Sequence, residues 1–98
     1  MIARIWRGVV RAEDAGTYAD YVRRTGIEEY EKTPGNRGAW ILLRPDGDRC
    51  EIVTLSFWES REAIIGFAGE DIDKAVYYPE DDQYLVDRDL TVRHYETA

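Results

Sequence analysis

The sequence contains few side chains of the types that take part directly in catalysis. Its one histidine, His94, has a pKa near neutrality in its free form, which suits a general base or a hydrogen-bond partner. Arg7 follows Trp6 in an otherwise apolar segment, where a cation can stabilise a phenolate or an enolate. Tyr77 and its neighbour Tyr78 can reach a ligand hydroxyl. The candidate catalytic residues are therefore Arg7, Tyr77 and His94.

Aromatic side chains are the candidate walls of a binding pocket. Those nearest the ends of the predicted elements are Trp6, Tyr30, Trp58, Phe67 and Tyr78. Each also has a structural interpretation, because aromatic residues at strand ends and on helix faces usually belong to the core. The polar candidates have such interpretations too. Arg7 can form an ion pair, His94 can lie on the sheet surface or at a dimer interface, and Tyr77 can pack at a helix end.

Motifs for other chemistries are missing from the sequence. It has no Gly-rich phosphate loop, no Cys-x-x-Cys and no pair of histidines at ligand spacing. Residues 80–82 are acidic, but consecutive carboxylates point in different directions and match no calcium loop. We therefore expect a solvated loop there and no metal. The single cysteine, Cys50, lies in an apolar run and is expected to be a buried, inert thiol.

The composition indicates one globular domain over residues 1–98, with 44% apolar and 34% charged residues. The net charge of −7 argues against nucleic acid and anionic membranes as partners, because both carry negative charge. The N-terminal segment lacks the apolar region of a signal peptide, and no apolar run reaches the ~20 residues of a membrane span. We therefore expect a cytoplasmic protein.

Apolar spacing predicts the elements that must position the candidate side chains. β-Branched and aromatic runs predict strands at 2–10, 36–45, 49–58 and 90–97. Helical spacing predicts an amphipathic helix after the first strand, ending near Gly26, followed by a short helical piece. Ser60 suits the N-cap of a second helix, whose apolar face continues past a kink or break at Gly69 to Val76. Residues 77–89 are polar and are expected to be irregular.

The resulting order, βαββαβ, is that of the ferredoxin-like α+β fold. It predicts a four-stranded antiparallel sheet with the first strand central and both helices on one face. The second and third strands show no clean alternation of apolar and polar residues, which indicates that both faces of the sheet are covered. The second cover must come from another chain. We therefore expect a homodimer whose sheets pack face to face.

Three segments resemble the antibiotic biosynthesis monooxygenase family of the dimeric α+β barrel superfamily: 33–42 ("TPGNRGAWIL"), 55–81 ("LSFWES" through "YYPED") and 91–96 ("TVRHYE"). The resemblance covers nearly the whole chain and implies a pocket in each subunit between the sheet and the helices. It also implies oxidation of a phenolic or enolic small molecule by O₂ without metal, flavin or other cofactor. The expected partners are thus a small aromatic or hydrophobic substrate and a second copy of the chain.

A second branch of the same family binds and degrades haem. Aligned on Trp58, the position of that branch's iron-ligating histidine is Tyr77 here. Its tryptophan falls on Phe67, and its first-strand asparagine falls at about Arg7. These differences disfavour haem degradation. Two further alternatives are a non-enzymatic dimer that binds a small molecule and a related barrel enzyme such as a lactone isomerase.

Overall fold

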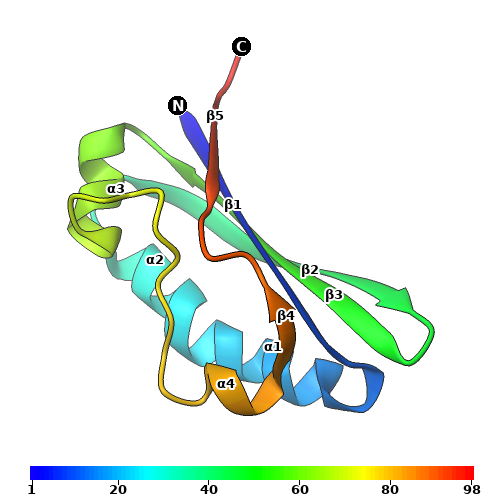
Figure 1. Ribbon diagram of the computed structural model, residues 1–98. Helices are drawn as coiled ribbons and strands as arrows, with labels where there is room; N and C mark the ends of the chain where they lie inside the picture. The colour runs from blue at the N-terminus through cyan, green and yellow to red at the C-terminus, as the bar shows by residue number, and fades with distance from the viewer.

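The structure is a computed structural model that describes all residues 1–98. Its strands are β1 (Ile2–Arg11), β2 (Asn36–Asp46), β3 (Arg49–Trp58), β4 (Leu85–Arg88) and β5 (Arg93–Glu96). Its helices are α1 (Ala15–Val22), α2 (Glu28–Lys32), α3 (Arg61–Ala68) and α4 (Asp81–Tyr84). The five strands form one antiparallel sheet in the order β2-β3-β1, with β4 and β5 both paired to the free edge of β1 (Figure 1).

The central strand, β1, pairs with β3 over ten positions, from Ile2 opposite Trp58 to Arg11 opposite Arg49. This register places the even-numbered residues of both strands on one face of the sheet. That face is the core face, because the even-numbered residues of β3 from Cys50 to Trp58 are buried, whereas the odd-numbered ones are not. The predicted α+β fold with a central first strand is therefore confirmed.

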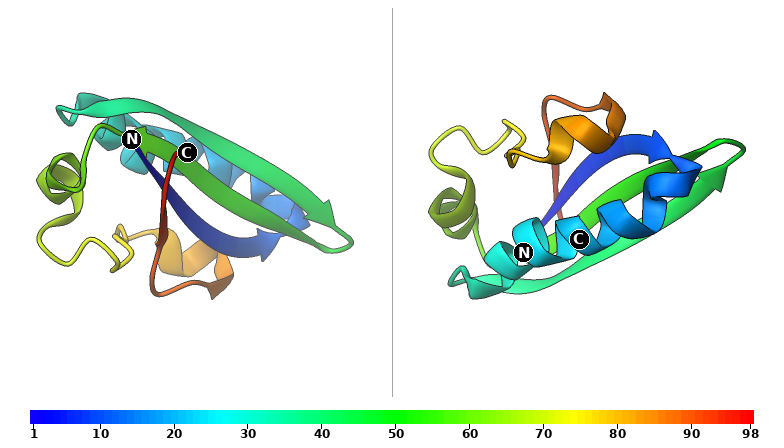
Figure 2. Two further views of the ribbon diagram at one scale, coloured as in Figure 1. Left: turned by 90° about the horizontal axis from the view of Figure 1, so that it is seen from above. Right: turned by 90° about the horizontal axis from the view of Figure 1, so that it is seen from below.

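One nearly continuous helical run covers the core face (Figure 2). It begins with a 3-10 turn (Ala12–Asp14), and a π-helical turn (Arg23–Ile27) joins α1 to α2. Its buried side chains include Tyr18, Val22 and Tyr30, which belong to the core cluster. The opposite face of the sheet carries no helix of this chain (Figure 2). The helices thus lie on one face, as predicted.

The second predicted helix is shorter than expected. Its start is confirmed, because the Ser60 hydroxyl accepts a hydrogen bond from the Ala63 N–H at 3.2 Å. The helix ends at Ala68, and Gly69 follows with φ of 82°, a conformation that favours glycine. Residues 69–80 then form an irregular strand-like segment with a single bridge to the segment before β5. The prediction that the helix continues to Val76 is wrong.

The backbone of this segment forms hydrogen bonds to the C-terminal part of the chain as well as short-range turns of its own. The Val92 N–H donates to the Asp73 carbonyl at 2.8 Å, and the Ala75 N–H donates to the Leu90 carbonyl at 3.1 Å. These contacts replace the helical hydrogen bonds while Ala75 still packs into the core. The prediction of an irregular 77–89 is also corrected, because α4 and β4 form there and β4 adds a fifth strand.

Candidate functional site

A cavity of about 40 Å³ lies between the core face of the sheet, the helical run and the segment 69–81. The sheet contributes Arg4, Trp6 and Thr54, and the helices contribute Tyr18, Tyr30 and Phe67 among others. The irregular segment and the start of α4 contribute Val76, Tyr77, Tyr78 and Asp81. Most of the lining is apolar or aromatic, so the few charged groups in it define what the cavity can bind.

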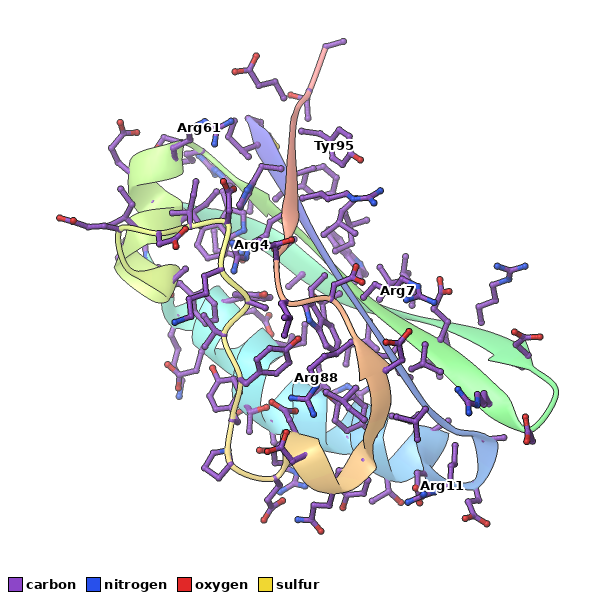
Figure 3. All side chains as sticks on the ribbon, in the orientation of Figure 1. Arg4, Arg7, Arg11, Arg61, Arg88 and Tyr95 are labelled. Carbon is purple, nitrogen blue, oxygen red and sulfur yellow. The ribbon has the colours of Figure 1, made fainter.

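Arg4 is the cation of this cavity. Its side chain points from β1 toward the segment 69–80, and the residue is only 1% exposed (Figure 3). Its Nη1 donates to the Ile72 carbonyl oxygen and is 2.9 Å from His94 Nε2. Its Nε is buried and has no hydrogen-bond partner, and no carboxylate forms an ion pair with it. The guanidinium carbon lies 5.9 Å from the centre of the Phe67 ring.

His94 connects Arg4 to a carboxylate. Its Nδ1 lies 3.0 Å from Asp73 Oδ1, and its side chain is 3% exposed. Because arginine can only donate, Nε2 of His94 must be the acceptor, and the ring proton must lie on Nδ1 and point to Asp73. Burial and the positive charge of Arg4 lower the pKa of His94, against the smaller opposing effect of Asp73. The histidine is therefore neutral at pH 7 and orients Arg4.

This neutral histidine predicts a loss of stability in mild acid. Unfolding releases His94 to its usual pKa near 6.5, so the unfolded chain binds a proton more readily than the folded chain. The histidine's contribution is fully present above that pKa and is lost as the pH falls below it toward the lowered folded pKa. The charged groups that act on the ring are Arg4, Asp73 and Arg61.

Urea denaturation at pH 7.5 and pH 5.5 measures this effect. The free energy of unfolding of the wild-type protein should fall more between these pH values than that of His94→Gln, whose amide oxygen can still accept from Arg4. An equal decrease in both proteins would contradict a neutral, buried His94.

The wall opposite the sheet is held by a buried carboxylate. Asp81 is 4% exposed, and it accepts hydrogen bonds from the Tyr18 hydroxyl at 2.9 Å and the Tyr78 N–H at 2.6 Å. Burial and the Asp81 charge raise the pKa of Tyr18 above its usual range, and burial is the main cause that raises the pKa of Tyr78 to about 12. Both phenols therefore stay protonated. The expectation that 80–82 is wholly solvated is wrong for Asp81, because Tyr18 covers it.

Tyr77 and Trp6 form a fixed side of the cavity. The Trp6 indole N–H donates to the Tyr77 hydroxyl at 3.0 Å, and this hydroxyl donates to the Asp89 carbonyl oxygen. The two rings meet edge to face with centres 6.1 Å apart. Burial raises the pKa of Tyr77, so its hydroxyl keeps its proton at neutral pH.

The structure brings some of the predicted site residues together and leaves others outside. Trp6, Tyr30, Phe67, Tyr77 and Tyr78 line the cavity. Trp58 is fully buried behind it, against Tyr30 and Phe67. His94 lies behind Arg4 and reaches the cavity only through that side chain.

Arg7 lies on the other side of β1 from Arg4 (Figure 3). It is paired there with Glu51, with Nε 2.9 Å from Oε2, and it lies near Asp87 and Asp89. The hydrogen bond to Glu51 raises the pKa of Arg7 above its usual value. Arg7 faces away from the cavity because side chains alternate along a strand with a period of two, which puts odd-numbered Arg7 on the face opposite to Trp6. The sequence carried a signal for Arg4, since it shares its parity with Trp6.

The structure offers no preformed metal site. No three His, Cys, Asp or Glu side chains converge in a way that could hold a metal ion. Tyr77, at the position of the haem branch's iron ligand, has its hydroxyl bonded to Trp6 and Asp89, and both ring nitrogens of the single histidine, His94, are engaged as well. None of the helices is both long and apolar enough to cross a membrane.

The fold described above occurs in solved structures that are described as antibiotic biosynthesis monooxygenases. No protein-family model matches the sequence, and no curated protein matches it significantly. Solved structures do match. A "putative antibiotic biosynthesis monooxygenase" from Nitrosomonas europaea is 17% identical, with a TM-score of 0.68 over 99% of this chain and 98% of that one. A protein of the same description from Bacillus cereus is also 17% identical, with a TM-score of 0.69 over 99% and 94%.

The heme-degrader MhuD from Mycobacterium tuberculosis, solved with two hemes bound in its active site, has the same fold. It is 18% identical, with a TM-score of 0.59 over 99% of this chain and 95% of that one. The fold therefore occurs both in proteins described as monooxygenases and in a heme-degrader. Identities this low show the shared fold, and the function has to be argued from the cavity.

Proposed function

We propose that this protein is a member of the antibiotic biosynthesis monooxygenase family that oxidises a phenolic or enolic small molecule with O₂ and no cofactor. The observation that carries the proposal is the cavity itself, whose lining is mostly apolar or aromatic and includes one buried guanidinium. An apolar lining limits the access of water and a buried cation stabilises an organic anion, and these are the two conditions that the reaction needs. Trp6, Phe67 and Tyr77 are proposed to hold the substrate ring.

The proposed reaction requires no metal, flavin or other cofactor. A phenol that has lost its proton is electron-rich, and its negative oxygen is stabilised by Arg4. For a phenol with a free para position, one atom of O₂ becomes the second carbonyl oxygen of a para-quinone. The other atom leaves as water together with two hydrogens of the substrate. The substrate supplies all four electrons, so the protein contributes binding, orientation and electrostatics.

One observation favours a second candidate, a non-enzymatic protein that binds a small hydrophobic molecule. The cavity contains no free general base, because Tyr18, Tyr77 and Tyr78 stay protonated and Asp81 already accepts two hydrogen bonds. A lactone isomerase, the third candidate, would need Asp81 to act as its base.

We also propose that the protein is a cytoplasmic homodimer, with its single cysteine buried and unpaired. The face of the sheet without helices is largely apolar. It carries Ile5, Val53, Leu55, Phe57, Trp40, Leu42 and Tyr95. Trp40 is 51% exposed there, and a patch of this kind marks an interaction surface. A second copy fits it, since the same apolar face on each partner is self-complementary.

Oxygen uptake separates the three candidate functions. The purified chain should consume O₂ with one-ring and two-ring phenols and form one quinone for each O₂ consumed, with or without a metal chelator. Arg4→Gln should lower the turnover number by roughly 10²–10³-fold, as loss of an oxyanion donor does. Arg7→Gln, a matched change on the other face, should leave it unchanged. Tight binding without oxygen uptake would support the binding protein, and isomerisation under nitrogen would support the isomerase.

A further inference from the structure

The cavity contains an uncompensated positive charge. Every one of the eight arginine ion pairs in this chain involves a partly exposed arginine, and none of them involves Arg4. A fully buried guanidinium without a carboxylate is unfavourable, because burial removes its hydration and nothing negative replaces it. The one carboxylate that lines the cavity, Asp81, is instead bound to Tyr18 and the Tyr78 backbone.

The donors of Arg4 are only partly used. Both of its hydrogen bonds come from Nη1, one to Ile72 and one to His94. Nε has no partner although it is buried. A guanidinium presents its donors as a planar fork, which matches the two oxygens of a carboxylate or the oxygen of an enolate. The Phe67 ring beside the guanidinium leaves a flat surface against which a planar group can lie.

We propose that the cavity is a site for a small planar organic acid, whose carboxylate or enolate pairs with Arg4 while its ring lies among Trp6, Phe67 and Tyr77. This inference rests on the proposed function, since it names the substrate class of the same site. His94 is a positioning residue in it. As a neutral ring it accepts from Arg4 without repelling it, and Asp73 holds the ring in that orientation.

The cavity volume limits the size of the acid. About 40 Å³ is enough for a few water molecules, whereas a cavity that binds benzene measures about 150 Å³. A one-ring acid therefore enters only when the segment 69–80 moves outward with Val76 and Tyr78. That segment has no regular secondary structure, so it is the wall of the cavity whose opening disturbs neither the sheet ladder nor the hydrogen bonds within the helical run.

Calorimetry under nitrogen with two matched probes tests the charge preference. 4-Hydroxybenzoate carries the carboxylate at pH 7.5, and 4-hydroxybenzamide has the same shape without the charge. The wild-type protein should bind the benzoate at least tenfold more tightly. Arg4→Gln should remove this difference, Arg4→Lys should keep part of it, and Arg7→Gln should keep all of it. Equal affinities, no binding of either probe, or a preference that survives in Arg4→Gln would overturn the proposal.

A second measurement needs no variant and so does not depend on Arg4→Gln folding. The chain has three tryptophans, so its NMR spectrum contains only three indole N–H signals to follow. Addition of 4-hydroxybenzoate should shift the signal of Trp6, which lines the cavity, and leave that of Trp40, which lies on the other face. A shift at Trp40 alone would overturn the proposed site.

Failure of this inference and failure of the proposed function are distinguishable, because binding under nitrogen does not depend on oxygenation. A preference for benzoate without oxygen uptake from any phenol would support the acid-binding site and contradict the monooxygenase activity. Oxidation of neutral phenols without a preference for benzoate would support the monooxygenase activity and contradict the acid-binding site.

Discussion

Replacing Trp58 with alanine is expected to lower the free energy of unfolding by about 3–5 kcal/mol, the usual cost of truncating a buried aromatic residue. Trp58 is fully buried, and its ring packs edge to face on Tyr30 with centres 5.6 Å apart. Its indole N–H also donates to the Ser56 hydroxyl at 2.9 Å, and this donor disappears with the ring. The free energy of unfolding of a domain of this size is about 5–15 kcal/mol in total, so the variant should be largely or partly unfolded at 37 °C.

Urea denaturation followed by circular dichroism measures this loss. Leu90→Ala is the control, because Leu90 is 72% exposed and its truncation should change the free energy of unfolding by less than about 0.5 kcal/mol. A loss below about 1 kcal/mol in Trp58→Ala would mean that the aromatic cluster with Tyr30 and Phe67 is not the core of the molecule.

Leu55→Glu is expected to convert the proposed homodimer into a monomer. Leu55 lies opposite Ile5 on one side and Trp40 on the other, so it occupies the centre of the face that carries no helix. In a face-to-face dimer, each copy would bury one new carboxylate in this apolar surface. No cation lies among the residues paired with it, and burial of an unpaired charge is strongly unfavourable.

Light scattering during size-exclusion chromatography at micromolar concentration gives the mass of each variant. The wild type and the control Leu90→Glu should elute at twice the mass of the 11.4 kDa chain, and Leu55→Glu at the mass of one chain. Circular dichroism should show the same helix and strand content in all three. A monomeric wild type would refute the second copy as the cover of this face.

The strands were predictable because local patterns and long-range pairing agree in them. β-Branched and aromatic runs bounded by turn residues define β1, β2 and β3 to within one residue. Ser60 marks a helix start in the sequence and performs that role in the structure. The segment 69–76 was mispredicted because the helical spacing of Ile72, Ala75 and Val76 is shared by an irregular segment whose backbone bonds to residues far along the chain.

The candidate site was predictable in its aromatic part and not in its charged part. Most of the aromatic residues singled out in the sequence line the cavity, although Trp40 and Phe57 lie on the other face of the sheet. For the charged residues, strand periodicity puts Arg4 on the face of Trp6 and Arg7 on the opposite face, but it does not show which face is buried. The buried position of Asp81 depends on Tyr18, which lies 63 residues away in the sequence. Such a pairing has no local signature.

The ten-residue pairing of β1 with β3 and the irregular wall of the cavity have different evolutionary consequences. The long ladder fixes the architecture, and substitutions in it affect every element that packs on it. The segment 69–80 contributes side chains to the cavity but few hydrogen bonds to the ladder, so its residues can change with little effect on the sheet. Selectivity can therefore diverge faster than architecture. This separation is consistent with one fold being kept in chains that are only 17–18% identical to this one.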